Sequence, residues 1–89
     1  MSRLRITYTG KVQGVGFRAT AASIAAGFEV TGWVRNEPDR SVLLEVQGDD
    51  AEAKAFRQAL RARMTGNIKG EAELPVGEVR GEVGFEISR

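Results

Sequence analysis

A glycine-rich stretch followed by an arginine is the part of this sequence best suited to hold an anion. Residues 10–18 read GKVQGVGFR, with three glycines in the first seven positions and Arg18 at the end. Glycines allow backbone N–H groups to converge on one anion, and a helix that begins after such a stretch adds its own unsatisfied N–H groups. The guanidinium of Arg18 can bind two oxygens of one phosphate. Donors that converge from several directions favour phosphate over a carboxylate.

The residue types that the sequence lacks exclude several other kinds of chemistry. The 89 residues include no cysteine and no histidine, so no thiolate nucleophile, disulfide or histidine base is available. No metal-ligating side chains cluster near the glycine loop, and we expect neither a metal nor a cofactor. The formal net charge of +1 gives no reason to expect nucleic acid or a membrane as a partner. Because no leader-like or membrane-spanning apolar run is present, we expect a cytoplasmic protein.

Hydrophobic patterns place the glycine loop between a strand and a helix. Apolar and polar residues alternate over residues 3–9, which is typical of a half-buried strand. Over residues 17–28 the apolar residues recur at helical spacing. Alternation returns over residues 29–36 and 42–47, with a proline-containing turn between these two predicted strands.

The rest of the sequence predicts a second helix and two weaker strands. Apolar residues at helical spacing follow Asp49 and indicate an amphipathic helix. Residues 67–74 are predicted to form an edge strand, residues 75–84 a loop, and residues 85–88 a short last strand. One side of the edge strand would carry Ile68, Ala72 and Leu74.

The order of these elements is strand, helix, strand, strand, helix, strand, with a possible fifth strand. This order is typical of the ferredoxin-like α+β sandwich. We therefore expect residues 1–89 to form a single domain in which an antiparallel sheet of four to five strands carries two helices on one face. The other face of the sheet would be open.

This topology predicts that Asn36 lies beside the glycine loop. The first strand ends at the loop, and the helix then returns the chain so that the second strand ends at the same edge of the sheet, at Asn36. Asn36 shares its side of the strand with Gly32 and Val34, so its side chain should face the helices. We expect the loop, the start of the first helix and Asn36 to be neighbours, although Arg18 and Asn36 are 18 positions apart.

Taken together, these two motifs resemble those of the acylphosphatase family. That family carries a glycine, valine, glutamine, glycine, valine loop that ends in arginine, followed by a strand with the pattern GW-V-x-N. The corresponding segments here are GKVQGVGFR and GWVRN, and their spacing matches. The resemblance runs from about Arg3 to about Leu60, and the later FEI fits as well. It implies hydrolysis of an acyl phosphate to a carboxylate and inorganic phosphate.

The resemblance also implies roles for individual residues. Arg18 takes the place of the family's phosphate-binding arginine, and Asn36 that of the asparagine that orients the attacking water. The backbone that would complete the phosphate site belongs to Gly14, Val15, Gly16 and Phe17. This set suffices for the chemistry, since a carboxylate leaving group needs no general acid and the phosphate can accept the proton of water.

Two other functions stay open beside a small-molecule acyl phosphatase. The first is a non-catalytic module that binds phosphate or carbamoyl phosphate, since related domains occur within larger carbamoyl-transfer proteins. The second is an RNA-binding domain on a similar fold, but its paired aromatics are represented only by Tyr8. For the hydrolase we expect a monomer, with inorganic phosphate or sulfate as competing anions.

The sequence departs from the family pattern at two places near the site. Gly16 stands where some members carry a second aromatic residue, which the backbone role of this position tolerates. Glu37 directly follows Asn36, where some relatives have a small hydroxyl residue. Its carboxylate would lower the affinity for an anion unless it points to solvent.

Overall fold

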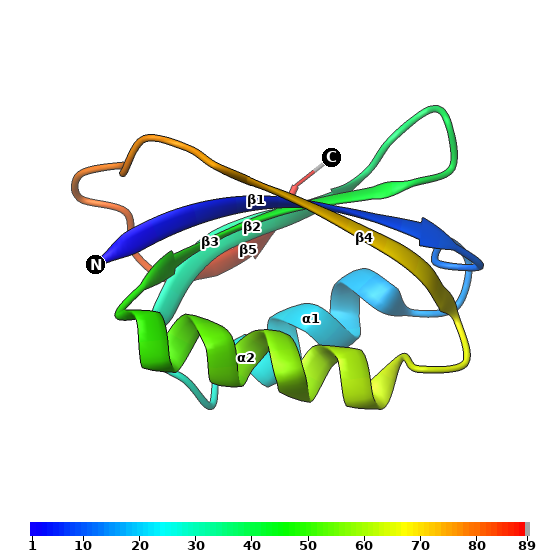
Figure 1. The fold of residues 1–89 in the computed structure, drawn as a ribbon, viewed down its shortest axis with the longest axis horizontal. Coiled ribbons are helices and arrows are strands. Elements are labelled where there is room, and N and C mark those ends of the chain that lie inside the picture. The colour runs from blue at the N-terminus through cyan, green and yellow to red at the C-terminus, as the bar shows by residue number, and fades with distance from the viewer. Residues whose placement is uncertain (89) are drawn as a thin grey trace.

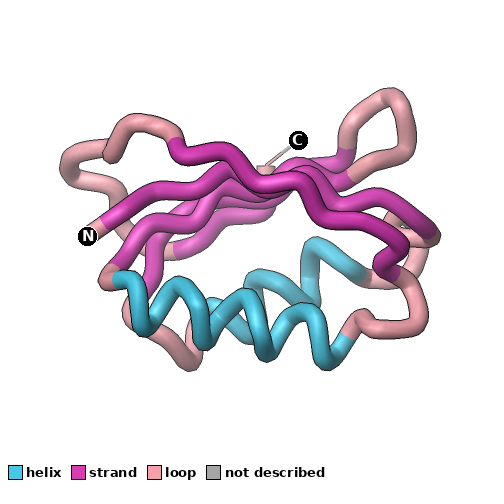
Figure 2. The backbone as a smooth tube through the Cα atoms, in the orientation of Figure 1, coloured by secondary structure: helices cyan, strands magenta, loops and turns pink. Residues whose placement is uncertain are grey.

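The computed structural model describes residues 1–88 and shows two helices packed on one face of a five-stranded sheet (Figures 1 and 2). The α+β architecture with both helices on the same face confirms the predicted ferredoxin-like sandwich. In chain order the elements are β1 (Ser2–Gly10), α1 (Phe17–Ala25), β2 (Val30–Asn36), β3 (Val42–Gly48), α2 (Asp50–Arg63), β4 (Ile68–Pro75) and β5 (Phe85–Ile87).

The sheet is mixed rather than wholly antiparallel, and the prediction was wrong at one edge. The strand order is β4-β1-β3-β2-β5, and β5 pairs parallel with β2, while the other three pairs are antiparallel. The physical reason is the path of residues 76–84. β4 ends beside the start of β1, where Pro75 pairs with Leu4, and this loop then carries the chain to the far edge of the sheet. β5 therefore starts at the same end as β2 and runs in the same direction.

The core lies between the sheet and the helices, and it also fixes the start of α1. Alternate residues of β1, β2 and β3 point into it, as the alternation in the sequence predicts. The ring centroids of Tyr8 and Phe17 are 5.0 Å apart. Because Phe17 is the first residue of α1, this buried contact holds the end of the glycine loop against the sheet. The side chains with no exposed surface are Ile6, Tyr8, Ala21, Val34, Val42, Leu44, Val46, Phe56 and Leu60.

The side chains of β4 divide differently from the prediction. The pairing of β1 with β4 shifts in register between Thr9 and Gly10. Ile68 consequently packs against the core, whereas Ala72 and Leu74 pair with residues of β1 that face away from the helices, and Leu74 is 56% exposed. A bulge of this kind moves side chains to the other face of the sheet, and the sequence pattern alone does not reveal it.

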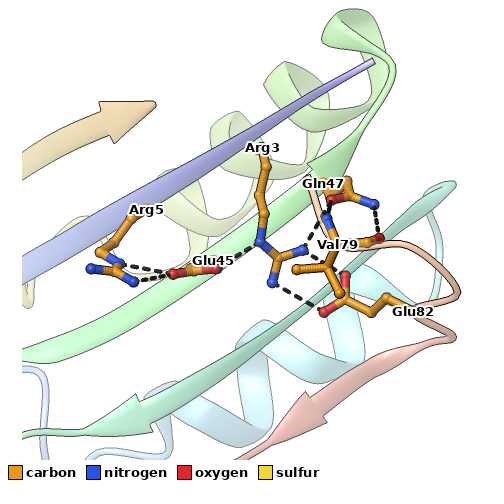
Figure 3. Close-up of polar contacts among 6 residues, drawn as sticks. All are labelled: Arg3, Arg5, Glu45, Gln47, Val79 and Glu82. Atoms are coloured by element: carbon orange, nitrogen blue, oxygen red, sulfur yellow. Dashed lines mark hydrogen bonds and ion pairs between the residues drawn. The ribbon is translucent and has the colours of Figure 1, made fainter. Parts of the chain in front are cut away.

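A buried ionic network covers one end of the face that carries no helix (Figure 3). Arg3 is 2% exposed, and its Nε donates to Glu45 Oε1 at 2.6 Å. Its Nη1 donates to Glu82 Oε1 at 2.7 Å, which binds the loop of residues 76–84 to β1. The side chain of Gln47 accepts from the backbone N–H of Val79 at 2.8 Å and strengthens the same attachment. The predicted open face is therefore covered at this end.

The network also perturbs the acidity of its carboxyl groups. The hydrogen bond from Arg3 lowers the pKa of Glu82, although partial burial opposes that shift. For Glu45, burial raises the pKa, but the hydrogen bonds and charges of Arg3 and Arg5 outweigh it, so the pKa lies below its ordinary value. Both carboxylates are thus stabilised in the ionised form that the buried guanidinium requires.

Candidate active site

A pocket of about 340 Å³ lies where the glycine loop meets the end of β2. It brings together residues from the loop, the first turn of α1, the last position of β2 and the end of β5. Of the four predicted backbone contributors, Gly14, Gly16 and Phe17 line it. Val15 does not line it, and its side chain packs against the core. The lining residues are Val12, Gly14, Gly16, Phe17, Arg18, Ala19, Asn36 and Ile87.

Two glycines give the loop a conformation that other residues rarely adopt. Gly14 and Gly16 both have φ of 76°, in the left-handed region. A Cβ atom at either position would meet no other atom within 4 Å, so the requirement for glycine is conformational rather than spatial. Gly16 is also the N-cap of α1, and its carbonyl oxygen accepts from the N–H of Thr20 at 2.9 Å.

The backbone N–H groups of this loop are free to bind a ligand. Within residues 1–88, none of the N–H groups of residues 14–17 donates a hydrogen bond to another residue. The first N–H groups of a helix have no intrahelical partner, and the helix dipole adds positive potential there. The loop and the helix start, which line the pocket, therefore carry several unsatisfied donors, and such donors suit a phosphate group.

Arg18 lies in the first turn of α1 and lines the same pocket. Its side chain is half-buried and makes no ion pair with any residue in the described part of the chain. A cation at a helix N-terminus is unfavourable because it opposes the helix dipole. A bound anion would remove that conflict, so the position of Arg18 complements the free N–H groups.

Asn36 lines the pocket from the side of the sheet. It is the last residue of β2, where it pairs with Val42 of β3. Its half-buried side chain reaches the pocket that Arg18 lines, which confirms the predicted proximity of the loop, the helix start and the end of β2. An amide at this position can orient a polar molecule beside a bound anion.

The carboxylate of Glu37 is directed away from this pocket. Its Oε2 accepts from Nε of Arg35 at 3.0 Å. Arg35 lies on the face of β2 that points away from the helices. Glu37 does not line the pocket. The ion pair with Arg35 therefore holds the carboxylate of Glu37 where it does not repel an anion in the pocket.

Gln13 connects the glycine loop to the turn after β2, a role that the sequence did not predict. Its Nε2 donates to the carbonyl oxygens of Glu37 and Ser41, at 2.9 Å in each case. The glycine loop is thereby tied to the turn that follows Asn36. The glutamine stands within the loop motif, but its partners are backbone atoms whose positions depend on the turn, so no residue pattern marks them.

Metal-ligating clusters and membrane-spanning helices are both absent from the described part of the chain. Over residues 1–88 no group of three or more carboxylate, histidine or cysteine side chains is arranged to hold a metal ion. Neither α1 nor α2 has the length and the apolar character needed to cross a membrane.

Comparison with known sequences identifies relatives of this chain. Residues 4–87 match the family model for acylphosphatase. An acylphosphatase from Oceanobacillus iheyensis is 46% identical over 56 residues, which are 63% of this chain and 62% of the relative. The match therefore spans less than two-thirds of that relative's length. An acylphosphatase from Rhizobium etli is 38% identical over 76 residues, which are 85% of this chain and 81% of the relative.

Solved structures share the fold over the full chain. The crystal structure of acylphosphatase from Bacillus subtilis superposes with a TM-score of 0.87 and 26% identity, and the match covers all of both chains. Full-length HypF in its phosphate- and nucleotide-bound form superposes with a TM-score of 0.77 and 26% identity, over 99% of this chain but 12% of that one. Because the family model matches residues 4–87 and the Rhizobium relative is 38% identical over most of the sequence, this chain belongs to the acylphosphatase family.

Proposed function

We propose that this protein hydrolyses acyl phosphates to a carboxylate and inorganic phosphate in the pocket between the glycine loop and the end of β2. The observation that carries the proposal is that one pocket is lined by the glycine loop, by Arg18 and by Asn36. Within residues 1–88 the N–H groups of residues 14–17 make no hydrogen bond and Arg18 makes no ion pair. The names of the relatives of this chain support the same activity.

In the proposed reaction the phosphoryl group is held and water is directed at it. The N–H groups of Gly14, Val15, Gly16 and Phe17, together with Arg18, bind the phosphoryl oxygens and stabilise the charge that they carry in the transition state. Asn36 orients a water molecule toward phosphorus. The water oxygen forms the new bond to phosphorus, and the bond to the acyl oxygen breaks with its electron pair leaving on the carboxylate. The proton of water passes to a phosphoryl oxygen.

The proposal also covers competing anions, the oligomeric state and the location of the protein in the cell. Inorganic phosphate and sulfate would compete with the substrate because they fit the same donors. All proposed site residues come from one chain, so a monomer consisting of one domain, residues 1–89, would be sufficient. A sequence without cysteine is compatible with the cytoplasm, where we propose that the protein acts.

Release of phosphate from acetyl phosphate tests the proposal, with glycerol phosphate as the matched phosphomonoester. We expect rapid release from acetyl phosphate and almost none from the monoester, because the site offers no general acid for an alkoxide leaving group. Similar rates on both substrates would contradict the mechanism.

A non-catalytic phosphate-binding module is the second candidate. The observation in its favour is that a domain of this fold forms 12% of full-length HypF, a much larger protein. Binding of phosphate without any turnover of acetyl phosphate would favour this alternative.

A further inference from the structure

A second hollow, about 630 Å³ in volume, is lined by the glycine loop, the turn after β2 and the start of β4. Its lining residues include three cations, Lys11, Arg40 and Lys69. No acidic residue of the described part of the chain lines it. The whole chain has 13 basic and 12 acidic residues, so such a cluster is not a consequence of overall charge. Its other lining residues are Gly10, Val12, Gln13 and Gly14.

The irregular pairing at the end of β1 places two of these cations side by side. Gly10 has φ of 118°, and a Cβ atom there would clash with the backbone of Asn67 and Lys69. This close approach, with the hydrogen bond from the N–H of Lys11 to Asn67 O at 2.9 Å, brings the first residue after β1 against the start of β4. Lys11 and Lys69 consequently both line the hollow.

The third cation is held by an unusual backbone conformation. Arg40 has φ of 76° and is the one residue other than glycine with positive φ among residues 1–88. Glycine or asparagine is the ordinary choice at such a position, since a longer side chain is strained there. Its N–H donates to the carbonyl oxygen of Glu37 at 3.1 Å, so the turn between β2 and β3 presents Arg40 to the hollow.

None of the three cations is neutralised by a neighbour. Seven ion pairs form over residues 1–88, and none includes Lys11, Arg40 or Lys69. By contrast, Arg57 and Arg61, the cations of α2 that face β4, are paired with Glu71 and Glu73. Cations left together without carboxylates concentrate positive potential in a concave surface.

The basic hollow adjoins the proposed phosphate pocket, because Val12 and Gly14 line both. A substrate whose phosphoryl group lies against the loop would have to extend past Gly14 to reach Lys11, Arg40 and Lys69. We propose that this hollow binds a second anionic group of the substrate, so that the enzyme prefers acyl phosphates whose acyl part carries a carboxylate or a phosphate. This inference rests on the proposed function.

The size of the preference follows from the exposure of the three side chains. Exposed ion pairs in water are weak, so each cation should contribute roughly twofold to fivefold in affinity. Together they should give on the order of tenfold discrimination at low salt. Added salt should reduce the discrimination, since the Debye length falls from about 10 Å at 0.1 M to about 3 Å at 1 M.

Non-hydrolysable ligands test the hollow without requiring any catalysis. The matched probes are 4-phosphonobutyrate and its neutral amide, which differ in the second charge alone, with propylene bisphosphonate as the phosphate-bearing probe. We expect both probes that carry a second anionic group to bind about tenfold more tightly than the amide. In Lys11→Met/Lys69→Met the difference should almost vanish. Lys54→Met, which removes an exposed cation of α2 outside the hollow, should leave it unchanged.

Kinetics with succinyl phosphate and butyryl phosphate separate this inference from the proposed function. The wild type should show a lower KM for succinyl phosphate, and the double variant should lose that advantage while its kcat for butyryl phosphate is retained. Equal affinity for the charged probes and the amide would overturn the inference, even if both acyl phosphates are hydrolysed. A preference that survives in the double variant would overturn it as well. Tight binding of the charged probes without hydrolysis would instead retain the hollow and refute the hydrolase.

Discussion

The side-chain amide of Gln13 lies 2.9 Å from the carbonyl oxygen of Glu37, the residue that follows Asn36. The same nitrogen donates to Ser41 O across the turn between β2 and β3. One side chain therefore joins the loop that supplies N–H groups to the turn next to the proposed water-orienting residue. We therefore expect this connection to help set the relative position of the loop and Asn36.

Gln13→Met should slow turnover more than it weakens phosphate binding. The substitution keeps the size of the side chain but removes both donors, so the turn and Asn36 can shift away from the loop. The N–H groups of residues 14–17 and Arg18 lie in the loop and the first turn of α1, so the anion site should be preserved. A shift of about 1 Å in a catalytic group can lower kcat by on the order of 10²-fold. The measurements are kcat and the inhibition constant of phosphate.

Gln13→Lys provides the matched test, because an ammonium group can donate to both carbonyl oxygens again. We expect it to recover much of the lost kcat, whereas Gln58→Met, at an exposed position on α2, should have no effect. Equal losses in Gln13→Met and Gln13→Lys would show that the hydrogen bonds are not what positions the site.

Substitutions of Arg18 and Asn36 should separate binding from turnover. Arg18→Lys keeps the charge but loses the planar pair of donors, so phosphate affinity and kcat should fall together, kcat by on the order of 10²–10³-fold. Asn36→Ala should abolish most turnover and leave phosphate inhibition near that of the wild type. Circular dichroism provides the folding control. If Asn36→Ala loses phosphate affinity but retains turnover, its role is not the orientation of water.

Gly16→Ala should destabilise the protein and weaken phosphate binding. The left-handed conformation of Gly16 costs a residue with a Cβ atom about 1–2 kcal/mol, although the site has space for the methyl group. Relief of this strain would turn the N–H groups of the loop away from the positions in which they can bind phosphate. Gly66→Ala is the matched control, because Gly66 also has open space but no positive φ. Urea unfolding and phosphate titration of both variants check the prediction, and equal effects would contradict it.

The network around Arg3 should make stability depend on pH in the acid range. The lowered pKa values of Glu45 and Glu82 mean that the unfolded chain binds more protons than the folded one in acid. Their contribution to the free energy of unfolding is complete above about pH 4.3, the ordinary value for glutamate, and is lost as the pH falls through the folded pKa.

Glu82→Gln tests this assignment by urea unfolding across a pH series. We expect a loss of about 1–3 kcal/mol at neutral pH, because Arg3 keeps its burial but loses one charged acceptor. The difference from the wild type should shrink as the pH falls below about 4. Glu86→Gln removes an exposed carboxylate outside the network and serves as the control. A difference that stays constant with pH would rule out the network as its source.

The sequence predicts the meeting of Arg18 and Asn36 because strand order alone determines which strand ends share an edge of the sheet. It does not predict the direction of β5. That direction depends on a loop fixed by the hydrogen bond between Arg3 and Glu82, which are 79 positions apart. The face of Ile68 was also predicted wrongly, since it depends on a register shift with no signature in residue type. The partners of Gln13 were missed for the related reason that they are backbone oxygens.

Because β5 pairs with β2 alone and over three residues, it should detach far more often than the rest of the sheet. Such short edge segments open at a small fraction of the free energy of global unfolding. The N–H of Ser88, bonded to Val34 O at 2.8 Å, should then exchange with deuterium well before the amides of β3. Each opening would carry Ile87 away while the glycine loop stays folded. The opening of β5 would therefore set the fraction of time for which the pocket is closed on that side.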